Sequence, residues 1–303
     1  MVANGQTPRR QIDIGAENAP LTDAQRESLA AAVSAHNFAN ERKVLMEALA
    51  GHPKSADLYV VLGRLAFLEK HPSDAASAFE KADQLRTLDP KDRETMALSY
   101  AFGQESDKAR VQLQRLEREF PNKAEYPFTL GRVEEQLGRL EAAIEEYGRA
   151  IAINKNLLPA YHQMGGCQER MGKAEEERKT YEQAVEVNQS LPERSAWPPL
   201  DLGALEEQSG KLSEAEGHIR EAIGYAPNLY QAHYRLGMVL EKESKNDVAL
   251  EEFRKAAASN QFYAPAYLAL GRIYGKLGKK EEAEQALTRF RELKAEAGRK
   301  PQN

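Results

Sequence analysis

Residues 231–260 read QAHYRLGMVLEKESKNDVALEEFRKAAASN, and this stretch decides the fold. Its small residues, Gly237 and Ala249, and its large residues, Leu236 and Phe253, have the spacing of two amphipathic helices joined by a turn. The Leu-Gly pair recurs with spacings of 68, 72, 34 and 34 residues, at Leu62-Gly63, Leu130-Gly131, Leu202-Gly203, Leu236-Gly237 and Leu270-Gly271. These are multiples of 34 with four residues added once, which predicts a tandem array of 34-residue helical hairpins.

Eight repeats fit this register, and positions are numbered from 1 at the first residue of each repeat. The repeats begin at Thr22, Ala56, Pro90, Ala124, Leu158, Ala196, Tyr230 and Ala264. An insertion of four residues, 192–195, falls between the fifth and sixth repeats and lengthens the loop there. We therefore expect a flexible lead-in over residues 1–21, a repeat array over 22–297 and a tail over 298–303.

The repeat columns predict how each hairpin packs and turns. Position 8 is small in all repeats but the first, and positions 20 and 27 are mostly Ala, so we expect the small columns of the two helices to meet. Large residues at positions 7 and 24 fill the remaining space. Glycines at position 15 predict first-helix ends at Gly138, Gly172, Gly210 and Gly278. Ser213 with Glu216 predicts a capping box at one second helix.

This pattern resembles the tetratricopeptide repeat family, whose 34-residue motif is Trp-x2-Leu-Gly-x2-Tyr followed by Ala, Phe, Ala and Pro. Three repeats depart from it: the first lacks the Leu-Gly pair, the third has Met96-Ala97, and the fifth has Glu177 in place of Ala. The resemblance implies an all-α fold, a right-handed α-solenoid of about eight hairpins. It also implies a non-catalytic protein-binding scaffold or adaptor. The residues that bind chaperone tails in one well-known member are absent, which argues against that role.

Composition narrows the classes of function. The chain has 303 residues, a net charge of −5 and no basic stripe, so we expect no nucleic-acid partner. No apolar run is long enough to span a bilayer, so membrane insertion is not expected either. The single cysteine, Cys167, is expected to be a buried thiol. No motif points to a catalytic site, a cofactor or a metal. The cytoplasm is the default compartment, and an extracytoplasmic one applies if a signal peptide was removed.

The resemblance assigns positions 2, 5, 6, 9, 12 and 13 to a concave groove, where a peptide or protein segment would bind. The candidate groove residues are Phe128, Arg132, Glu135, His162, Glu169, Trp197, Leu200, Glu207, Tyr234, Arg235, Met238, Glu241, Leu268 and Arg272. The position-5 row is apolar or amphipathic and suits a peptide. The position-12 glutamates either bind a basic segment of a partner or form a solvated helix face with ion pairs.

Several alternatives remain open at this point. The aromatic residues at position 24, such as Tyr147 and Phe253, are expected to be core residues. Trp197 is either a binding hot spot or the side chain that fills the gap beside the insertion. Beyond the scaffold hypothesis, the chain is either a self-assembling component of a homo-oligomer or a regulatory subunit of an enzyme complex.

Overall fold

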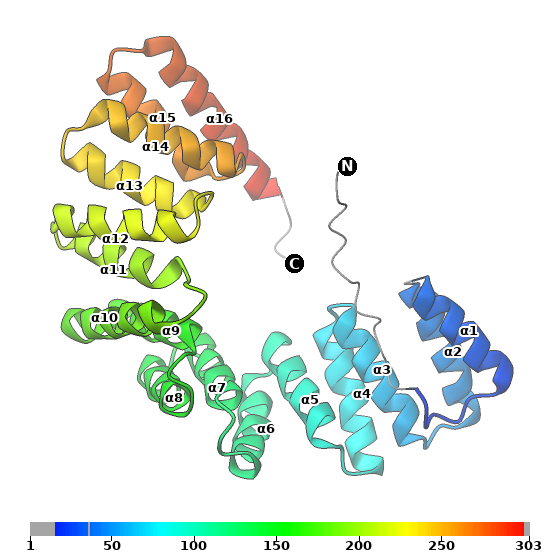
Figure 1. Ribbon diagram of the computed structural model, residues 1–303. Helices are drawn as coiled ribbons and strands as arrows, with labels where there is room; N and C mark the ends of the chain where they lie inside the picture. The colour runs from blue at the N-terminus through cyan, green and yellow to red at the C-terminus, as the bar shows by residue number, and fades with distance from the viewer. Residues whose placement is uncertain (1–15, 36, 300–303) are drawn as a thin grey trace. The chain divides into compact units, whose positions relative to one another are not determined.

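The computed structural model describes residues 16–35 and 37–299, and these residues form sixteen α-helices and no strand (Figure 1). The chain divides into two compact units, Met1–Ile153 and Asn154–Asn303. Unit 1 contains α1 (Asp23–Ser34), α2 (Phe38–Gly51), α3 (Ala56–Leu68), α4 (Pro72–Leu85), α5 (Pro90–Phe102), α6 (Ser106–Glu119), α7 (Glu125–Gln136) and α8 (Leu140–Ile153). Unit 2 contains α9 (Leu158–Arg170), α10 (Ala174–Ser190), α11 (Trp197–Gln208), α12 (Leu212–Tyr225), α13 (Tyr230–Lys242), α14 (Asn246–Ser259), α15 (Ala264–Lys276) and α16 (Lys280–Arg299).

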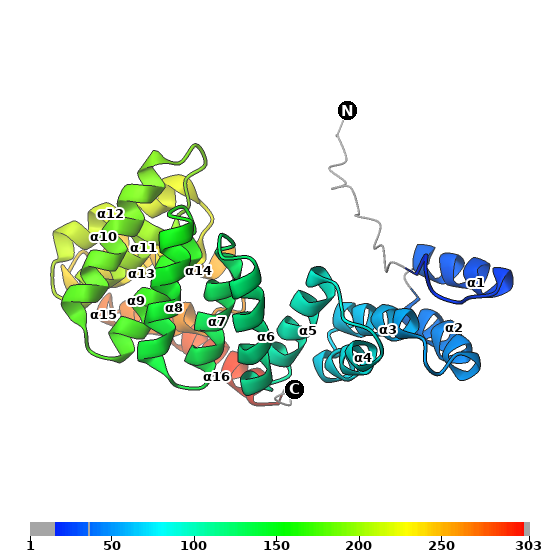
Figure 2. The ribbon, with the colours of Figure 1, turned by 90° about the horizontal axis from the view of Figure 1, so that it is seen from below.

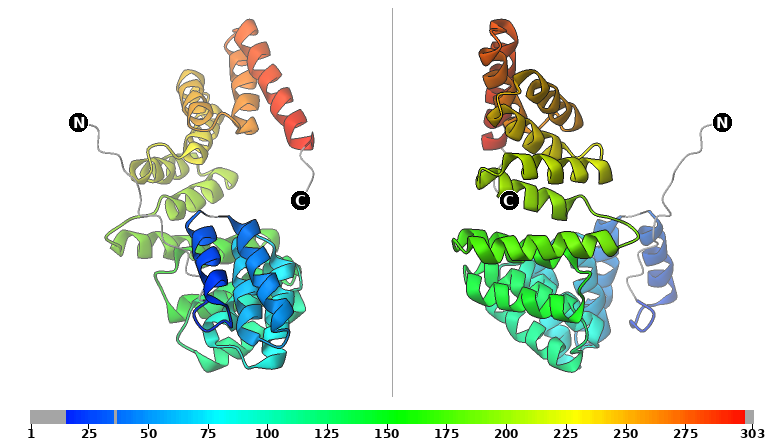
Figure 3. Two further views of the ribbon diagram at one scale, coloured as in Figure 1. Left: turned by 90° about the vertical axis from the view of Figure 1, so that its right-hand side faces the viewer. Right: turned by 60° about the vertical axis from the view of Figure 1, so that its left-hand side comes forward.

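Within each unit, consecutive helices pack side by side in chain order. Each odd-numbered helix forms a hairpin with the helix that follows it, and that second helix also packs against the first helix of the next repeat in the same unit (Figures 2 and 3). The predicted all-α fold of eight helical hairpins is confirmed. The first helices begin at the predicted repeat starts or one residue later.

Inside most hairpins, a glycine on the first helix lets a large side chain of the second helix pack directly against the backbone. A Cβ atom added to Gly237 would lie 2.6 Å from the Phe253 ring, and one added to Gly131 would lie 2.6 Å from the Tyr147 ring. The prediction that small columns meet small columns is therefore incomplete, because position 8 faces the large position-24 side chain of the same hairpin. Tyr147 and Phe253 are fully buried, which confirms that they are core residues.

The turns confirm the predicted glycine stops and extend them. Gly138, Gly172, Gly210 and Gly278 all have φ between 69° and 75°, the left-handed conformation that glycine adopts without strain. Lys70, Gln104 and Ser244 occupy the same position in three other repeats with φ of 61° to 63°. The left-handed turn is thus a property of the hairpin, and glycine is one of several residues found in it.

One expectation about a helix start is wrong, and the expected lead-in and tail lie partly outside the described residues. The capping box at Ser213 is wrong: the N-cap of α12 is Lys211, without a side-chain hydrogen bond, because the helix starts two residues earlier than that motif requires. Residues 1–15 of the lead-in and 300–303 of the tail lie outside the described residues. In the rest of the lead-in, Ala19 is buried against the first hairpin and its carbonyl accepts a hydrogen bond of 2.9 Å from Arg26.

Candidate protein-binding site

Eleven of the fourteen candidate residues lie on the first helices of unit 2. We call the surface formed by positions 2, 5, 6, 9, 12 and 13 of α9, α11, α13 and α15 the first-helix face. It carries His162, Glu169, Trp197, Leu200, Glu207, Tyr234, Arg235, Met238, Glu241, Leu268 and Arg272. The other three candidates lie on α7 in unit 1. There the Phe128 ring is 5.8 Å from the Tyr147 ring, Tyr147 donates a hydrogen bond of 3.0 Å to Glu135, and Arg132 is exposed.

A small hollow opens on this face beside Trp197. The Trp197 side chain is 44% exposed, and its ring centroid lies 6.1 Å from that of His162. His162 Nδ1 is 2.7 Å from Asp201 Oδ2, and the Asp201 side chain is only 13% exposed. Burial raises the pKa of Asp201, while the hydrogen bond with His162 acts in the opposite direction. The hollow measures about 230 Å³ and is lined by Leu158, Pro159, His162, Ala184, Ser195, Trp197, Pro198 and Asp201.

The four-residue insertion lies next to this hollow and contributes Ser195 to its lining. Three of the extra residues lengthen α10, which has 17 residues where α12 and α14 have 14, so the insertion is only partly a longer loop. Asn188 is fully buried at the end of α10. Its amide donates to the Ser195 carbonyl and its side-chain oxygen accepts from the Ser195 N–H, both at 2.8 Å. This pair of hydrogen bonds fixes the connection that places Trp197 at the start of α11.

Two position-12 glutamates are enclosed in ion pairs between repeats. Glu207 is 4% exposed and lies 3.0 Å from Arg235 Nη1 and 2.8 Å from Lys242 Nζ. Glu241 is 8% exposed and makes the same kind of contact with the next repeat, at 2.5 Å to Arg272 and 2.6 Å to Lys276.

The buried position of Glu241 and its ion pairs act in opposite directions on its pKa. Burial raises the pKa of Glu241, but hydrogen bonds from Arg272 and Lys276 outweigh it and hold the pKa below the ordinary value. These carboxylates join α11 to α13 and α13 to α15. Glu169, in contrast, is exposed and accepts a hydrogen bond of 3.4 Å from Gln208.

The position-5 row is not a uniform surface. His162 and Leu268 are exposed, whereas Leu200 is 4% exposed and belongs to the apolar cluster that also contains Ile219 and Leu236. Tyr234 is intermediate: its ring packs 5.3 Å from Tyr263, edge to face. Leu200 therefore contributes to the core of unit 2 and leaves its neighbours to form the accessible surface.

The sequence analysis included Arg235 and Arg272 but missed the position-13 residues that also contact the position-12 glutamates. Gln208, Lys242 and Lys276 are spaced by 34 residues at position 13, and each contacts the position-12 glutamate of the preceding repeat. This column was visible in the sequence as a polar stripe of constant spacing. Asp201 and Asn188 had no such signal, because their roles depend on contacts with His162 and Ser195.

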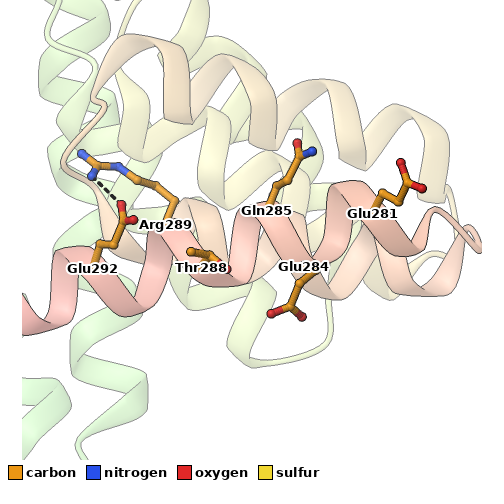
Figure 4. Close-up of a pocket in the computed structure, with 6 residues that line it drawn as sticks. All are labelled: Glu281, Glu284, Gln285, Thr288, Arg289 and Glu292. Atoms are coloured by element: carbon orange, nitrogen blue, oxygen red, sulfur yellow. Dashed lines mark hydrogen bonds and ion pairs between the residues drawn. The ribbon is translucent and has the colours of Figure 1, made fainter.

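The surface of the last helix is polar. Leu250 and Ala257 on α14 are buried, whereas the equivalent residues on α16, Glu284 and Arg291, form an exposed ion pair of 3.1 Å. A shallow hollow on α16 is lined by Glu281, Glu284, Gln285, Thr288, Arg289 and Glu292, with Arg289 and Glu292 paired at 3.0 Å (Figure 4). This face of α16 is therefore charged where the equivalent face of α14 is apolar and buried.

Two further findings concern membranes and metals. Among residues 16–35 and 37–299, no helix combines the length and apolar character that crossing a membrane requires. Within that part of the chain, no three or more His, Cys, Asp or Glu side chains are grouped so that they could hold a metal ion. Cys167 is fully buried on α9, as expected of a thiol in the packed interior.

Comparison with known proteins agrees with this architecture. One tetratricopeptide repeat profile matches residues 95–157 and 200–264, and a second matches residues 158–191 and 264–296. The chain belongs to the tetratricopeptide repeat family. The matched ranges include α9, α13 and α15 of unit 2 and α11 from residue 200 onward.

Solved structures share the tetratricopeptide repeat fold. The Pseudomonas aeruginosa protein pilF is similar, with 19% identity, coverage of 68% of this chain and 97% of that one, and a TM-score of 0.57. A tetratricopeptide repeat protein from Parabacteroides merdae has 16% identity, coverage of 82% and 97%, and a TM-score of 0.57. A chain of the APC/C hetero-tetramer Cut9–Hcn1 has 18% identity, coverage of 84% and 50%, and a TM-score of 0.52. No curated protein matches the sequence.

Proposed function

We propose that unit 2 is a protein-interaction module that receives a segment of a partner protein on its first-helix face. The observation that carries this proposal is the hollow beside Trp197, which is about 230 Å³ in volume and joins a half-exposed indole to a largely buried carboxylate. Membership of the tetratricopeptide repeat family supports a scaffold or adaptor role. The non-catalytic nature of that role is part of the proposal.

The hollow has the properties of an anchor site for one side chain. Trp197 offers a large aromatic surface with few rotatable bonds, the kind of residue that dominates binding energy at interfaces. Pro159 and Pro198 add rigid walls, and the Asn188 hydrogen bonds fix the connection behind them. Because these groups are already held in place, a partner would lose little conformational entropy in ordering them.

Affinity capture from a lysate of the source organism, with the intact chain as bait, tests the proposal. The test variant carries Trp197→Ala and Leu268→Ala, because both side chains are substantially exposed and their removal leaves the core intact. Substitutions at Leu200 or Glu207 are unsuitable because both residues are buried. We expect the double variant to retain at least about tenfold less partner than the parent, as loss of a hot-spot aromatic residue predicts.

The matched control is Val248→Ala, which removes an equally exposed apolar side chain from α14, outside the first-helix face. It should capture the partner as the parent does. Circular dichroism should give the same helix content for all three proteins. Equal capture by the parent and the Trp197 variant would contradict the assignment of this face.

A further inference from the structure

We propose that the first-helix face of α13 and α15 binds an acidic segment of the partner through internal Asp and Glu side chains. We call Arg235, Lys242, Arg272 and Lys276 the cationic strip. This inference rests on the proposed function, because it names the chemistry of the partner that the same face receives. It differs from the expectation that the position-12 glutamates read a basic segment.

The charge balance of the strip is the first argument. Glu207 and Glu241 are enclosed, with side chains 5% and 7% exposed. The four cations that surround them remain at the surface, with side chains 39% to 47% exposed. Four positive charges against two negative ones leave an excess of two positive charges on this surface, although the whole chain carries −5. A partner segment on this surface therefore meets positive potential.

The cations are also held in position before a partner arrives. Each of the four contacts a buried carboxylate, and Lys242 donates a second hydrogen bond, of 3.2 Å, to the Glu207 carbonyl. A guanidinium has five N–H donors and an ammonium has three, so the ion pairs within the protein leave donors for a ligand. Ordering long side chains in advance lowers the entropic cost of binding. The buried glutamates thus act as positioning residues for the strip.

The surroundings of the strip add apolar contacts for the same segment. Leu268 is 41% exposed, and Met238 lies beside the strip, with its sulfur 3.2 Å from Arg272 Nη2. The rings of Tyr230 and Tyr234 lie 4.7 Å and 5.3 Å from Tyr263 and form an aromatic cluster at the junction of α13 and α15. A segment that alternates acidic and apolar residues would match both kinds of group.

An acidic protein segment fits better than the other anionic ligands. The cations lie at two seams, by which we mean the contacts between neighbouring first helices, α11/α13 and α13/α15. A single C-terminal carboxylate would engage only the two cations of one seam. Nucleic-acid binding draws on many phosphate contacts and is opposed by the net negative charge of the chain. Several acidic side chains in one segment can satisfy both seams at once.

Fluorescence anisotropy with defined peptides tests this inference on the full chain. The probes are fluorescein-labelled, C-terminally amidated peptides with repeated Glu-Glu-Leu-Ser, Gln-Gln-Leu-Ser or Lys-Lys-Leu-Ser units. We expect the Glu peptide to bind at least about tenfold more tightly than the other two at low salt, and less tightly as salt rises. Equal or tighter binding of the Gln or Lys peptide would overturn the inference, as would no binding of the Glu peptide at the highest soluble protein concentration.

Paired variants separate the strip from overall charge. Lys242→Gln with Lys276→Gln leaves Arg235 and Arg272 to hold the two glutamates, and we expect at least about fivefold weaker binding of the Glu peptide. Lys179→Gln with Lys294→Gln removes two exposed lysines from α10 and α16 and should leave binding unchanged. Equal losses in both double variants would show a response to net charge and overturn the inference.

Two outcomes keep this inference distinct from the proposed function. Tighter binding of a labelled single-stranded oligonucleotide than of the Glu peptide would overturn the acidic-protein assignment. If the Glu peptide fails to bind while the Trp197 variant still loses its captured partner, the interaction module stands and only the acidic chemistry falls. If the Glu peptide binds through the cationic strip while the Trp197 variant captures as much partner as the parent, the hollow beside Trp197 is not the anchor site, but the acidic chemistry stands.

Discussion

The same two repeat positions are joined by different chemistry in the two units. In unit 1, position 12 of α3 and position 13 of α5 are Phe67 and Phe102, whose ring centroids lie 6.0 Å apart. In unit 2 the same positions are Glu207 with Lys242 and Glu241 with Lys276. Phe102 is 53% exposed and lines a hollow of about 420 Å³, so the contact between α3 and α5 is apolar and open, whereas the contacts between α11 and α13 and between α13 and α15 are ionic.

This difference separates the residues that make the fold from those that make the surface. Position 8 glycine and the large position-24 residue meet in both units, as Gly63 with Phe79 and Gly237 with Phe253 show. Positions 12 and 13 vary because either an aromatic contact or an ion pair can join neighbouring first helices. The repeat therefore keeps its hairpin while the chemistry that it offers to a partner changes along the chain.

The largest expected effect tests whether the hairpins are equivalent in both units. Gly131→Val in unit 1 and Gly237→Val in unit 2 each place a Cβ 2.6 Å from an aromatic ring. We expect each to lower the free energy of unfolding by about 3 kcal/mol, since overpacking forces the neighbouring helices apart. Chemical denaturation followed by circular dichroism measures the effect. A loss confined to one unit would show that the hairpins are not built alike.

A pH-dependent effect distinguishes the first hairpin of unit 2 from its neighbours. Burial, together with the nearby Glu169, raises the pKa of Glu177 from 4.5 to about 7. The folded chain keeps this proton to higher pH than the unfolded chain does, so stability falls as pH rises from about 4.5 to about 7 and then levels off. We expect Glu177→Gln to stabilise the chain by about 2 kcal/mol at pH 8 and to have little effect at pH 4.

Thermal unfolding of the parent and Glu177→Gln across this pH range provides the measurement. Ala249 occupies the equivalent position of α14, and Ala249→Gln serves as a control for the introduction of an amide in an otherwise apolar column. The control should destabilise at every pH. A pH-independent gain from Glu177→Gln would mean that the carboxyl does not titrate in this range.

The seams themselves are expected to differ in their response to salt. Glu241→Gln in unit 2 and Phe102→Ala in unit 1 should each cost about 1 kcal/mol, because the cations and the ring are partly exposed. In 1 M NaCl the effect of Glu241→Gln should shrink, whereas that of Phe102→Ala should persist. Urea titrations at two salt concentrations make the comparison. Identical salt dependence would mean that charge does not distinguish the two seams.

The smallest expected effect concerns the turns. Ser244→Gly in unit 2 and Lys70→Gly in unit 1 should each stabilise the chain by about 0.5 kcal/mol, because relief of the left-handed strain exceeds the added entropy of the unfolded glycine. Gly210→Ser is the reciprocal control and should destabilise by a similar amount. Melting temperatures that move in the opposite direction would show that the turn is held by other contacts.

Much of the fold was predictable from particular residues. The Leu-Gly pairs gave the period of 34, and the position-15 glycines gave four of the turns, because both depend on local backbone and side-chain size. The capping box at Ser213 was wrong because the helix starts two residues earlier than the motif requires, so Ser213 is not the N-cap. The site was harder: Leu200 and Leu268 share position 5, yet one is buried and the other is 41% exposed.

The sequence by itself determined the eight hairpins, their register and the column of position-12 glutamates. Only the tertiary structure decided that Glu207 and Glu241 face cations from the following repeat and that Trp197 borders a hollow with Asp201. The physical reason is that hairpin packing follows from residue size at fixed spacing. Ion pairs and hollows depend on distances between side chains that are 28 to 39 residues apart.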